Sequence, residues 1–230
     1  MIVGLGLYTY YSIQHVQAAA HLSARAARLE RRIQLISKLP MASVAYKGNV
    51  ISSIFTTVSF LEALANELFA DAANDDGGHL TQLSPTQRAS IAANLRSDRF
   101  ERKPVMAKFH ILLQSAGCPP INRGDTLHQH VDAAIQLRNA LVHYKAEFFD
   151  VGTEGMVRNG SFMGGDLASR IKGKFPHRPG SSPMEADSWI SAGCSRWALR
   201  SSLAFTDELF SRLSVTPLYA HVRNNIDPGV

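Results

Sequence analysis

The sequence predicts an all-α protein, an up-and-down bundle of about five or six helices with a long loop insertion before the last helix. Alanine and leucine recur, and few segments alternate apolar and polar residues as strands do. Several long segments repeat apolar residues at helical spacing instead. Hydrophobic residues make up 45% of the 230 residues, enough to build a core. We therefore expect one helical domain over residues 1–230.

The first half of the chain contains two long predicted helices. The first covers residues 8–37, is rich in alanine and ends in the charged run RLERR before Pro40, within an N-terminal helical segment of residues 1–43. The second covers residues 49–73 and ends at NDDGGH, a turn-forming sequence. Its apolar positions follow helical spacing: Ile51, Ile54, Phe55, Val58, Leu61, Ala65, Leu68 and Phe69.

Three further helices have recognisable starts or ends. In SPTQRASIAANL, Ser84 is a predicted N-cap, Pro85 suits the first helical position, and Gln87 completes a capping box. The next predicted helix, residues 104–116, ends at Gly117. The one after it covers residues 125–148, with Asp125 or Thr126 as its cap.

A Gly-, Pro- and Ser-rich insertion follows at residues 150–183. Loops of that length are usually functional or disordered. Its basic side chains, Arg170, Lys172, Lys174 and Arg178, predict a contact with an RNA backbone, and a solvated loop is the alternative. A final helix over residues 184–213 is expected to bring large apolar side chains to the core: Trp189, Ile190, Trp197, Leu203, Phe205, Leu209 and Phe210.

Composition narrows the function classes only partly. The formal net charge of +5 permits an anionic partner without requiring one. Cys118 and Cys194 form no disulfide framework or metal-ligand spacing and suit a reduced, cytoplasmic protein. The nearest pattern to a metal site, His128 and His130, is weak because the two side chains point apart on a helix. No metal and no cofactor are predicted. The apolar N-terminus is too short to span a bilayer and resembles no signal peptide. We therefore expect no membrane span, and a weak membrane-surface role of this segment is the alternative.

One helix carries an unexpected charge. In AAIQLRNALVHYKAEF, Arg138 lies near the middle of the apolar stripe when successive residues are placed about 100° apart. Glu62 interrupts the apolar stripe of the second helix in the same way. Because a buried charge is costly unless it is paired, we expect Glu62 and Arg138 to form an ion pair within the bundle. A purely structural pair is the alternative.

A polar flank adjoins this arginine. Asn139 and His143 are four residues apart and so share one helix face, which the long side chain of Arg138 can reach. Taken alone, His143 is more often a surface or capping residue than a catalytic one. The combination of the three residues carries the functional hypothesis.

At RNALVH the sequence resembles the HEPN superfamily of helical bundles, whose hallmark is an arginine, four to six intervening residues and a histidine. Here those positions are Arg138 and His143, with Asn139 as the polar residue that often follows the arginine. FLEALANELF resembles an early helix of that family, with Glu62 as its acid. The resemblance covers residues 44–213. Some family toxins carry a tyrosine, the target of a modifying enzyme, two residues after the histidine. Here Tyr144 follows the histidine directly, so the resemblance does not extend to regulation by that modification. Tyr144 could still lie at the rim of the site.

The resemblance implies a metal-independent endoribonuclease, toxin-like or linked to antiviral defence. RNA supplies the nucleophile through its 2′-hydroxyl, His143 moves protons, and Arg138 binds the phosphate. Asn139 positions the phosphate or orients His143. The products carry 2′,3′-cyclic phosphate and 5′-hydroxyl ends. The resemblance also implies a C2 homodimer with a composite site, and an antitoxin or nucleotidyltransferase partner. A non-catalytic module that binds RNA, a nucleotide or a protein is the main alternative, and a structural bundle is the third.

Overall fold

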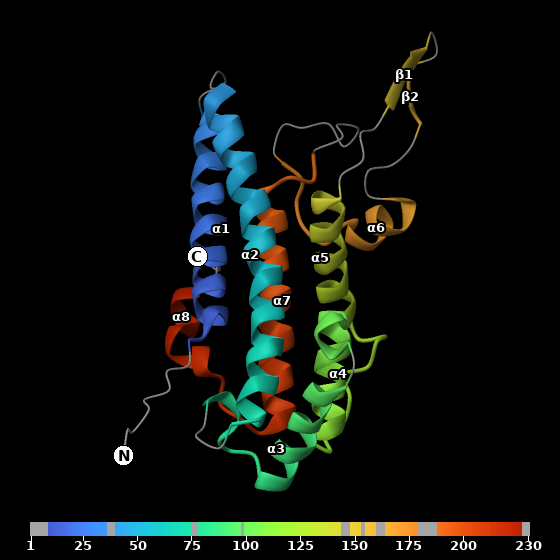
Figure 1. The fold of residues 1–230 in the computed structure, drawn as a ribbon. Coiled ribbons are helices and arrows are strands. Elements are labelled where there is room, and N and C mark those ends of the chain that lie inside the picture. The colour runs from blue at the N-terminus through green and yellow to red at the C-terminus, as the bar shows by residue number, and fades with distance from the viewer. Residues whose placement is uncertain are drawn as a thin grey trace.

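The computed structural model describes residues 9–35, 40–74, 78–97, 99–143, 148–152, 155–159, 164–178 and 188–226. The predicted all-α bundle is confirmed. Three long helices, α1 (Tyr11–Leu35), α2 (Pro40–Ala72) and α7 (Ala192–Leu213), run side by side (Figure 1). The shorter helices α3 (Pro85–Ala92), α4 (Val105–Ser115) and α5 (Thr126–Val142) complete the bundle against α2 and α7. The chain then closes through a 3₁₀ helix (Leu218–Val222) and α8 (Arg223–Ile226), which contacts α1.

Small side chains let α1 approach α2 and α7 closely. The residues that α1 buries are all small except one valine: Ser12, Val16, Ala19, Ala20, Ser23, Ala26 and Ala27. The hydroxyl groups of Ser23 and Ser195 on α7 are 3.0 Å apart, and Ser53 on α2 donates a hydrogen bond to the Ala19 carbonyl. These bonds satisfy hydroxyl groups that would otherwise be buried without a partner. The N-terminal helix is therefore an integral part of the bundle.

Helix α2 is the central core helix. It contacts α1, α7, α4 and α5, and its residues Phe60, Leu64, Leu68 and Phe69 are fully buried. By length and composition its segment Ser43–Ala72, which contains an 18-residue window with a mean hydropathy of 1.3, could also cross a membrane. Half of that window is buried inside the protein, and core helices of soluble proteins pass the same test. Its apolar character follows from its central position in the bundle.

The hydrophobic core forms two clusters along the bundle. One lies around Phe109, Phe205, Phe210 and Tyr219, and includes the buried residues of α3 and α4. The other lies around Tyr46, Leu137, Trp189 and Trp197, and joins α2, α5 and α7. All seven apolar residues that the sequence assigns to the core near the final helix are buried. α5 belongs mainly to the second cluster, beside which the candidate site lies.

The local signals around α3 and α4 are confirmed. Ser84 caps α3 in an extended conformation, and Gln87 forms the second half of the capping box, with Pro85 in the first turn. Helix α4 ends at Ser115 with Ala116 as its C-cap, after which Gly117 takes a φ of +71°. The Cys118 N–H then donates to the Leu113 carbonyl, which satisfies one of the free carbonyls of the helix end. These ends position the turn that leads into α5.

Three predicted helix boundaries are wrong. Helix α2 begins at Pro40 instead of residue 49, because proline is well suited to a first turn. Helix α5 ends at Val142, so it does not continue to residue 148. Helix α7 begins at Ala192 instead of residue 184, since Ser191 is extended and its hydroxyl accepts the Cys194 N–H.

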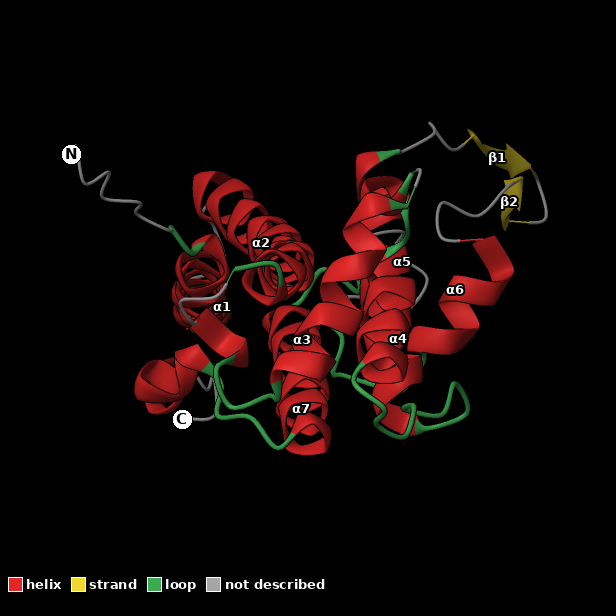
Figure 2. Cartoon of the chain, turned by 60° about the horizontal axis from the view of Figure 1, so that its bottom comes forward, coloured by secondary structure: helices red, strands yellow, loops and turns green. Residues whose placement is uncertain are grey.

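The predicted loop insertion contains regular structure. Strands β1 (Phe148–Gly152) and β2 (Gly155–Asn159) pair antiparallel, and helix α6 (Gly164–Ile171) follows them. α6 lies beside α5 (Figures 1 and 2). Leu167, Ile171 and Phe175 bury their side chains in the second core cluster. Residues 164–178 of the insertion are therefore fixed to the bundle, because they supply part of the core.

Candidate functional site

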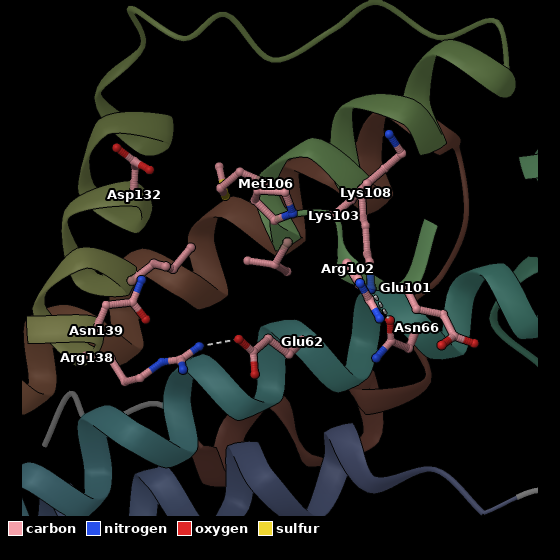
Figure 3. Close-up of a pocket in the computed structure, with 13 residues that line it drawn as sticks. Glu62, Asn66, Glu101, Arg102, Lys103, Met106, Lys108, Asp132, Arg138 and Asn139 are labelled. Carbon is pink, nitrogen blue, oxygen red and sulfur yellow. Dashed lines mark hydrogen bonds and ion pairs between the residues drawn. The ribbon is translucent and has the colours of Figure 1, made fainter. Parts of the chain in front are cut away.

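A pocket of about 520 Å³ opens between α2, α4 and α5 (Figure 3). Its volume lies within the usual range of small-ligand sites. Its lining is mostly polar and charged, and includes Glu62, Asn66, Glu101, Arg102, Lys103, Lys108, Asp132, Arg138 and Asn139. Two of the three predicted catalytic residues, Arg138 and Asn139, therefore belong to one pocket, together with the predicted acid.

The predicted ion pair between Glu62 and Arg138 is confirmed. The Arg138 guanidinium donates through Nη2 to Glu62 Oε1, and this contact joins α5 to α2 (Figure 3). The expectation that both groups are buried is wrong, because the side chains are 23% exposed for Arg138 and 47% exposed for Glu62. The pair lies in the wall of the pocket, where solvent and a ligand can reach it.

The position of Arg138 on its helix explains this exposure. The buried residues of α5 include Val131, Ala133, Ala134 and Leu137. Their centre lies about 60° from Arg138 around the helix axis, so the arginine is at the edge of the buried face. Val142, which lies about 40° from Arg138 around the axis and so falls within the predicted apolar stripe, is 50% exposed. The predicted stripe was too wide because the sequence does not show that α5 packs on the bundle along one side only.

His143 lies apart from the pocket. It is the exposed C-cap of α5, and its backbone N–H donates to the Asn139 carbonyl at 2.9 Å. The pocket lining does not include it. Arg138 and Asn139 are thus brought together with Glu62, whereas His143 lies one helical turn beyond Asn139 at the end of the helix. Tyr144 lies outside the described residues.

Lys108 is a pocket residue that the sequence reading missed. It is only 6% exposed, donates from Nζ to Asn66 Oδ1 at 2.6 Å, and lies 5.5 Å from the centre of the Phe100 ring. Burial lowers the pKa of its ammonium group, while the charges of Glu62 and Glu101 act in the opposite direction. The available signal was a single charge inside the apolar run VMAKFHILL. Nothing in the local sequence shows, however, that this lysine faces α2.

The predicted RNA-binding residues of the insertion have mixed roles. Arg170 on α6 donates to Asp132 of α5 at 2.8 Å, so this residue fixes α6 to the bundle. Lys172 and Lys174 are exposed. The backbone N–H of Arg178 donates to the Ser188 carbonyl at 2.9 Å. The two lysines stay candidates for an RNA contact, whereas Arg170 has a structural partner.

The histidines of α5 have separate neighbours, as their spacing predicts. The Nε2 atoms of His128 and of His110 on α4 are 3.1 Å apart. His130 packs edge-on against Trp197. Burial lowers the pKa of all three imidazoles. The described part of the chain contains no group of three or more His, Cys, Asp or Glu side chains placed to hold a metal ion. Cys194 is buried and Cys118 is partly buried, and both are free thiols.

Comparison of the chain with protein-family models, with curated proteins and with solved structures gave no match. The resemblance to the HEPN superfamily therefore rests on sequence alone: the Arg138–His143 spacing, Asn139, and Glu62 in FLEALANELF. A functional conclusion has to come from the chemistry of these residues.

Proposed function

We propose that the protein is a metal-independent endoribonuclease of the HEPN type, toxin-like or defence-associated, acting in the cytoplasm. The observation that carries the proposal is the Arg138 guanidinium, which a carboxylate holds in the wall of a polar pocket beside Asn139. An arginine held in this way can bind a phosphate with the donors that Glu62 leaves free. His143, one helical turn beyond Asn139, supplies an imidazole that can accept or donate a proton.

The reaction we propose uses the RNA itself as the source of the nucleophile. His143 takes the proton of the 2′-hydroxyl, and the oxygen attacks the adjacent phosphorus. Arg138 stabilises the negative charge that develops on the phosphate oxygens. The bond to the 5′-oxygen breaks and that oxygen takes up a proton, which leaves a 2′,3′-cyclic phosphate and a 5′-hydroxyl. Asn139 orients the phosphate.

A second protomer completes the site in this proposal. His143 is exposed at the end of α5 and does not line the pocket of its own chain. Val142, beside it, is an apolar side chain that is 50% exposed. A C2 homodimer that joins the ends of α5 would cover Val142 and bring each His143 to the other protomer's Arg138. Light scattering at micromolar concentration tests this, and a clean monomer would count against the composite site.

A non-catalytic module that binds RNA, a nucleotide or a protein is the second candidate. The observation in its favour is the same separation: Arg138 and Asn139 line the pocket and His143 does not. Such a pocket could bind a phosphate without any group in place to move a proton. The two functions differ in whether RNA is cut, which an experiment in cells can decide.

The cellular test compares the wild type with Arg138→Ala and His143→Ala. We expect expression of the wild type to slow growth and to fragment cellular RNA, and both variants to lose these effects. Equal growth and intact RNA in all three strains would exclude the nuclease. A melting curve accompanies each variant, because Arg138→Ala also removes an ion pair. A toxin of this kind would be expected to have an antitoxin or nucleotidyltransferase partner, and rescue of growth by such a protein is the corresponding assay.

A further inference from the structure

Lys108 has more hydrogen-bonding capacity than its surroundings use. An ammonium group has three donors, and among the described residues its hydrogen-bond partner is the neutral Asn66 carbonyl oxygen. No carboxylate of the described residues forms a salt bridge with it at 4.0 Å or less, although its ammonium group lies at a pocket whose wall includes Glu62 and Glu101. A lysine that is only 6% exposed normally has a direct charged partner. The missing partner is therefore expected to be an anion from outside the chain.

Two of the four cationic side chains that line the pocket are anchored to neighbouring turns of α2. Arg138 contacts Glu62, and Lys108 contacts Asn66, four residues further along the same helix (Figure 3). Four residues of α-helix rise by about 6 Å. This is comparable with the distance between consecutive phosphates along a nucleic-acid strand. A strand that places one phosphate at Arg138 could thus place the next one at Lys108.

The start of α4 adds a second favourable element at the Lys108 end. Pro104 is the N-cap of the helix, no side chain caps it, and its first turn has no acidic residue. Val105 and Met106, in that first turn, line the same pocket. Backbone N–H groups of a first turn have no acceptor within the helix, and the helix dipole favours an anion there. Arg102 and Lys103, which are exposed and line the same pocket, add positive charge.

We propose that Lys108, with Asn66 and the first turn of α4, forms a second phosphate subsite, which binds the RNA phosphate next to the one held by Arg138. This inference rests on the proposed function, because it assumes that RNA is the ligand of Arg138. Asn66 positions the ammonium group, and Lys108 binds the non-bridging oxygens of the second phosphate. The subsite would fix the register of the strand in the pocket without taking part in bond cleavage.

The test measures binding of a fluorescein-labelled single-stranded RNA octamer by anisotropy at several KCl concentrations. All proteins carry His143→Ala, so that the RNA stays intact. Adding Lys108→Met keeps the apolar stem of the side chain and removes its charge. We expect about tenfold weaker binding, and a slope of log affinity against log salt that is less negative by about 0.7, the value for one phosphate contact with a single strand. Arg28→Met, which removes one exposed charge on α1, is the matched control and should change neither quantity.

A second measurement leaves Lys108 in place, in case Lys108→Met unfolds the protein. Octamers with a single uncharged methylphosphonate linkage are bound in turn, one for each position. We expect a methylphosphonate at either of two consecutive linkages to weaken binding to the His143→Ala protein. Once Arg138→Ala is added, a methylphosphonate at only one of these two linkages should still weaken binding. No pair of consecutive sensitive linkages, or a folded Lys108→Met variant with unchanged affinity and salt slope, would overturn the subsite.

These results separate the subsite from the proposed nuclease. If wild-type protein cleaves RNA and Lys108→Met binds as tightly as its parent, the subsite is wrong and the nuclease stands. If the binding effects appear but the wild type never cleaves RNA, the subsite stands and the nuclease is wrong. If the parent protein binds no RNA, both are wrong.

Discussion

Arg138 of α5 and Glu62 of α2, 76 positions apart in the sequence, form an ion pair in the wall of a polar pocket. The pair does two things at once. It connects an outer helix to the central helix, and it holds a guanidinium group where an external anion can reach it. Because an arginine has five N–H donors, binding one carboxylate leaves others for a phosphate. In the proposed function the pair supports both folding and binding, and substitution can separate the two roles.

Replacing the acid should have opposite effects on stability and binding. Glu62→Gln removes a negative charge that competes with phosphate for Arg138, so we expect tighter RNA binding, measured by anisotropy in the His143→Ala background. The side chain is 47% exposed, so the free energy of unfolding should fall by less than about 1 kcal/mol, measured by urea denaturation.

Glu208→Gln is the matched control, since Glu208 pairs with Arg212 on α7 and is 38% exposed. It should leave RNA affinity unchanged while costing similar stability. Weaker RNA binding by Glu62→Gln than by this control would show that the carboxylate positions Arg138 more than it competes with the ligand.

Gly78 should be intolerant of any side chain. It has a φ of +74°, and an added Cβ would lie 2.4 Å from the carboxyl atoms of Asp71. That carboxylate accepts hydrogen bonds from the Tyr10 hydroxyl and the His79 N–H, both at 2.8 Å, so it has little freedom to move. Gly78→Ala should lower the free energy of unfolding by about 1–3 kcal/mol, measured by urea denaturation.

Gly48 is the contrasting position, because it lies within α2 and an added Cβ meets no atom within 4 Å. Gly48→Ala should raise stability by about 0.5–1 kcal/mol, since alanine favours the helix. Equal effects of the two substitutions would show that the region around Asp71 is looser than its hydrogen bonds indicate.

The His110–His128 pair should make the protein less stable in acid. Their Nε2 atoms are 3.1 Å apart, so one ring donates and the other accepts, and both rings cannot be protonated without losing this bond. Burial lowers the pKa of each imidazole, and the charge of Arg123 lowers both further. At His128, Arg170 also lowers the pKa, whereas Asp132 and Asp125 raise it. The unfolded chain, with histidine pKa values of about 6.5, then binds more protons than the folded protein. Stability is therefore fully present above about pH 6.5 and falls as the pH decreases below it.

Urea denaturation at pH 7.5 and pH 5.5 measures this effect. The difference in unfolding free energy between the two pH values should be smaller for His110→Gln/His128→Gln than for the wild type. Part of the dependence should persist, because burial also lowers the pKa of His130. An unchanged difference would mean that the pair does not contribute to acid sensitivity.

The sequence carried enough information to predict the pair but not its exposure. Glu62 and Arg138 each interrupt a helical pattern, and two opposite charges that do so are strong candidates for a contact. Which side of a helix is buried depends on its neighbours, however, and only the assembled bundle shows that α5 packs along its Leu137 side. Lys108 was missed for the same reason, since its role depends on facing Asn66 of another helix.

Local chemistry predicted some helix ends and not others. The Ser84 capping box was readable because both partners lie within four residues of each other. Ser191 also caps a helix, but no matching acid or amide marks it, and the preceding residues are apolar enough to extend the pattern. The end of α5 at Val142 has no glycine or proline signal, so periodicity alone placed the boundary too late.

The measurement that tests the central claim most directly is cleavage of single-stranded RNA by purified protein in the presence of EDTA. His143→Ala is compared with His21→Ala, which changes an exposed histidine on α1. We predict that the wild type and His21→Ala cut the RNA to products with 2′,3′-cyclic phosphate ends, and that His143→Ala is slower by about 10²–10⁴-fold at unchanged melting temperature. Intact RNA with the wild type, or equal cleavage by His143→Ala, would contradict the claim.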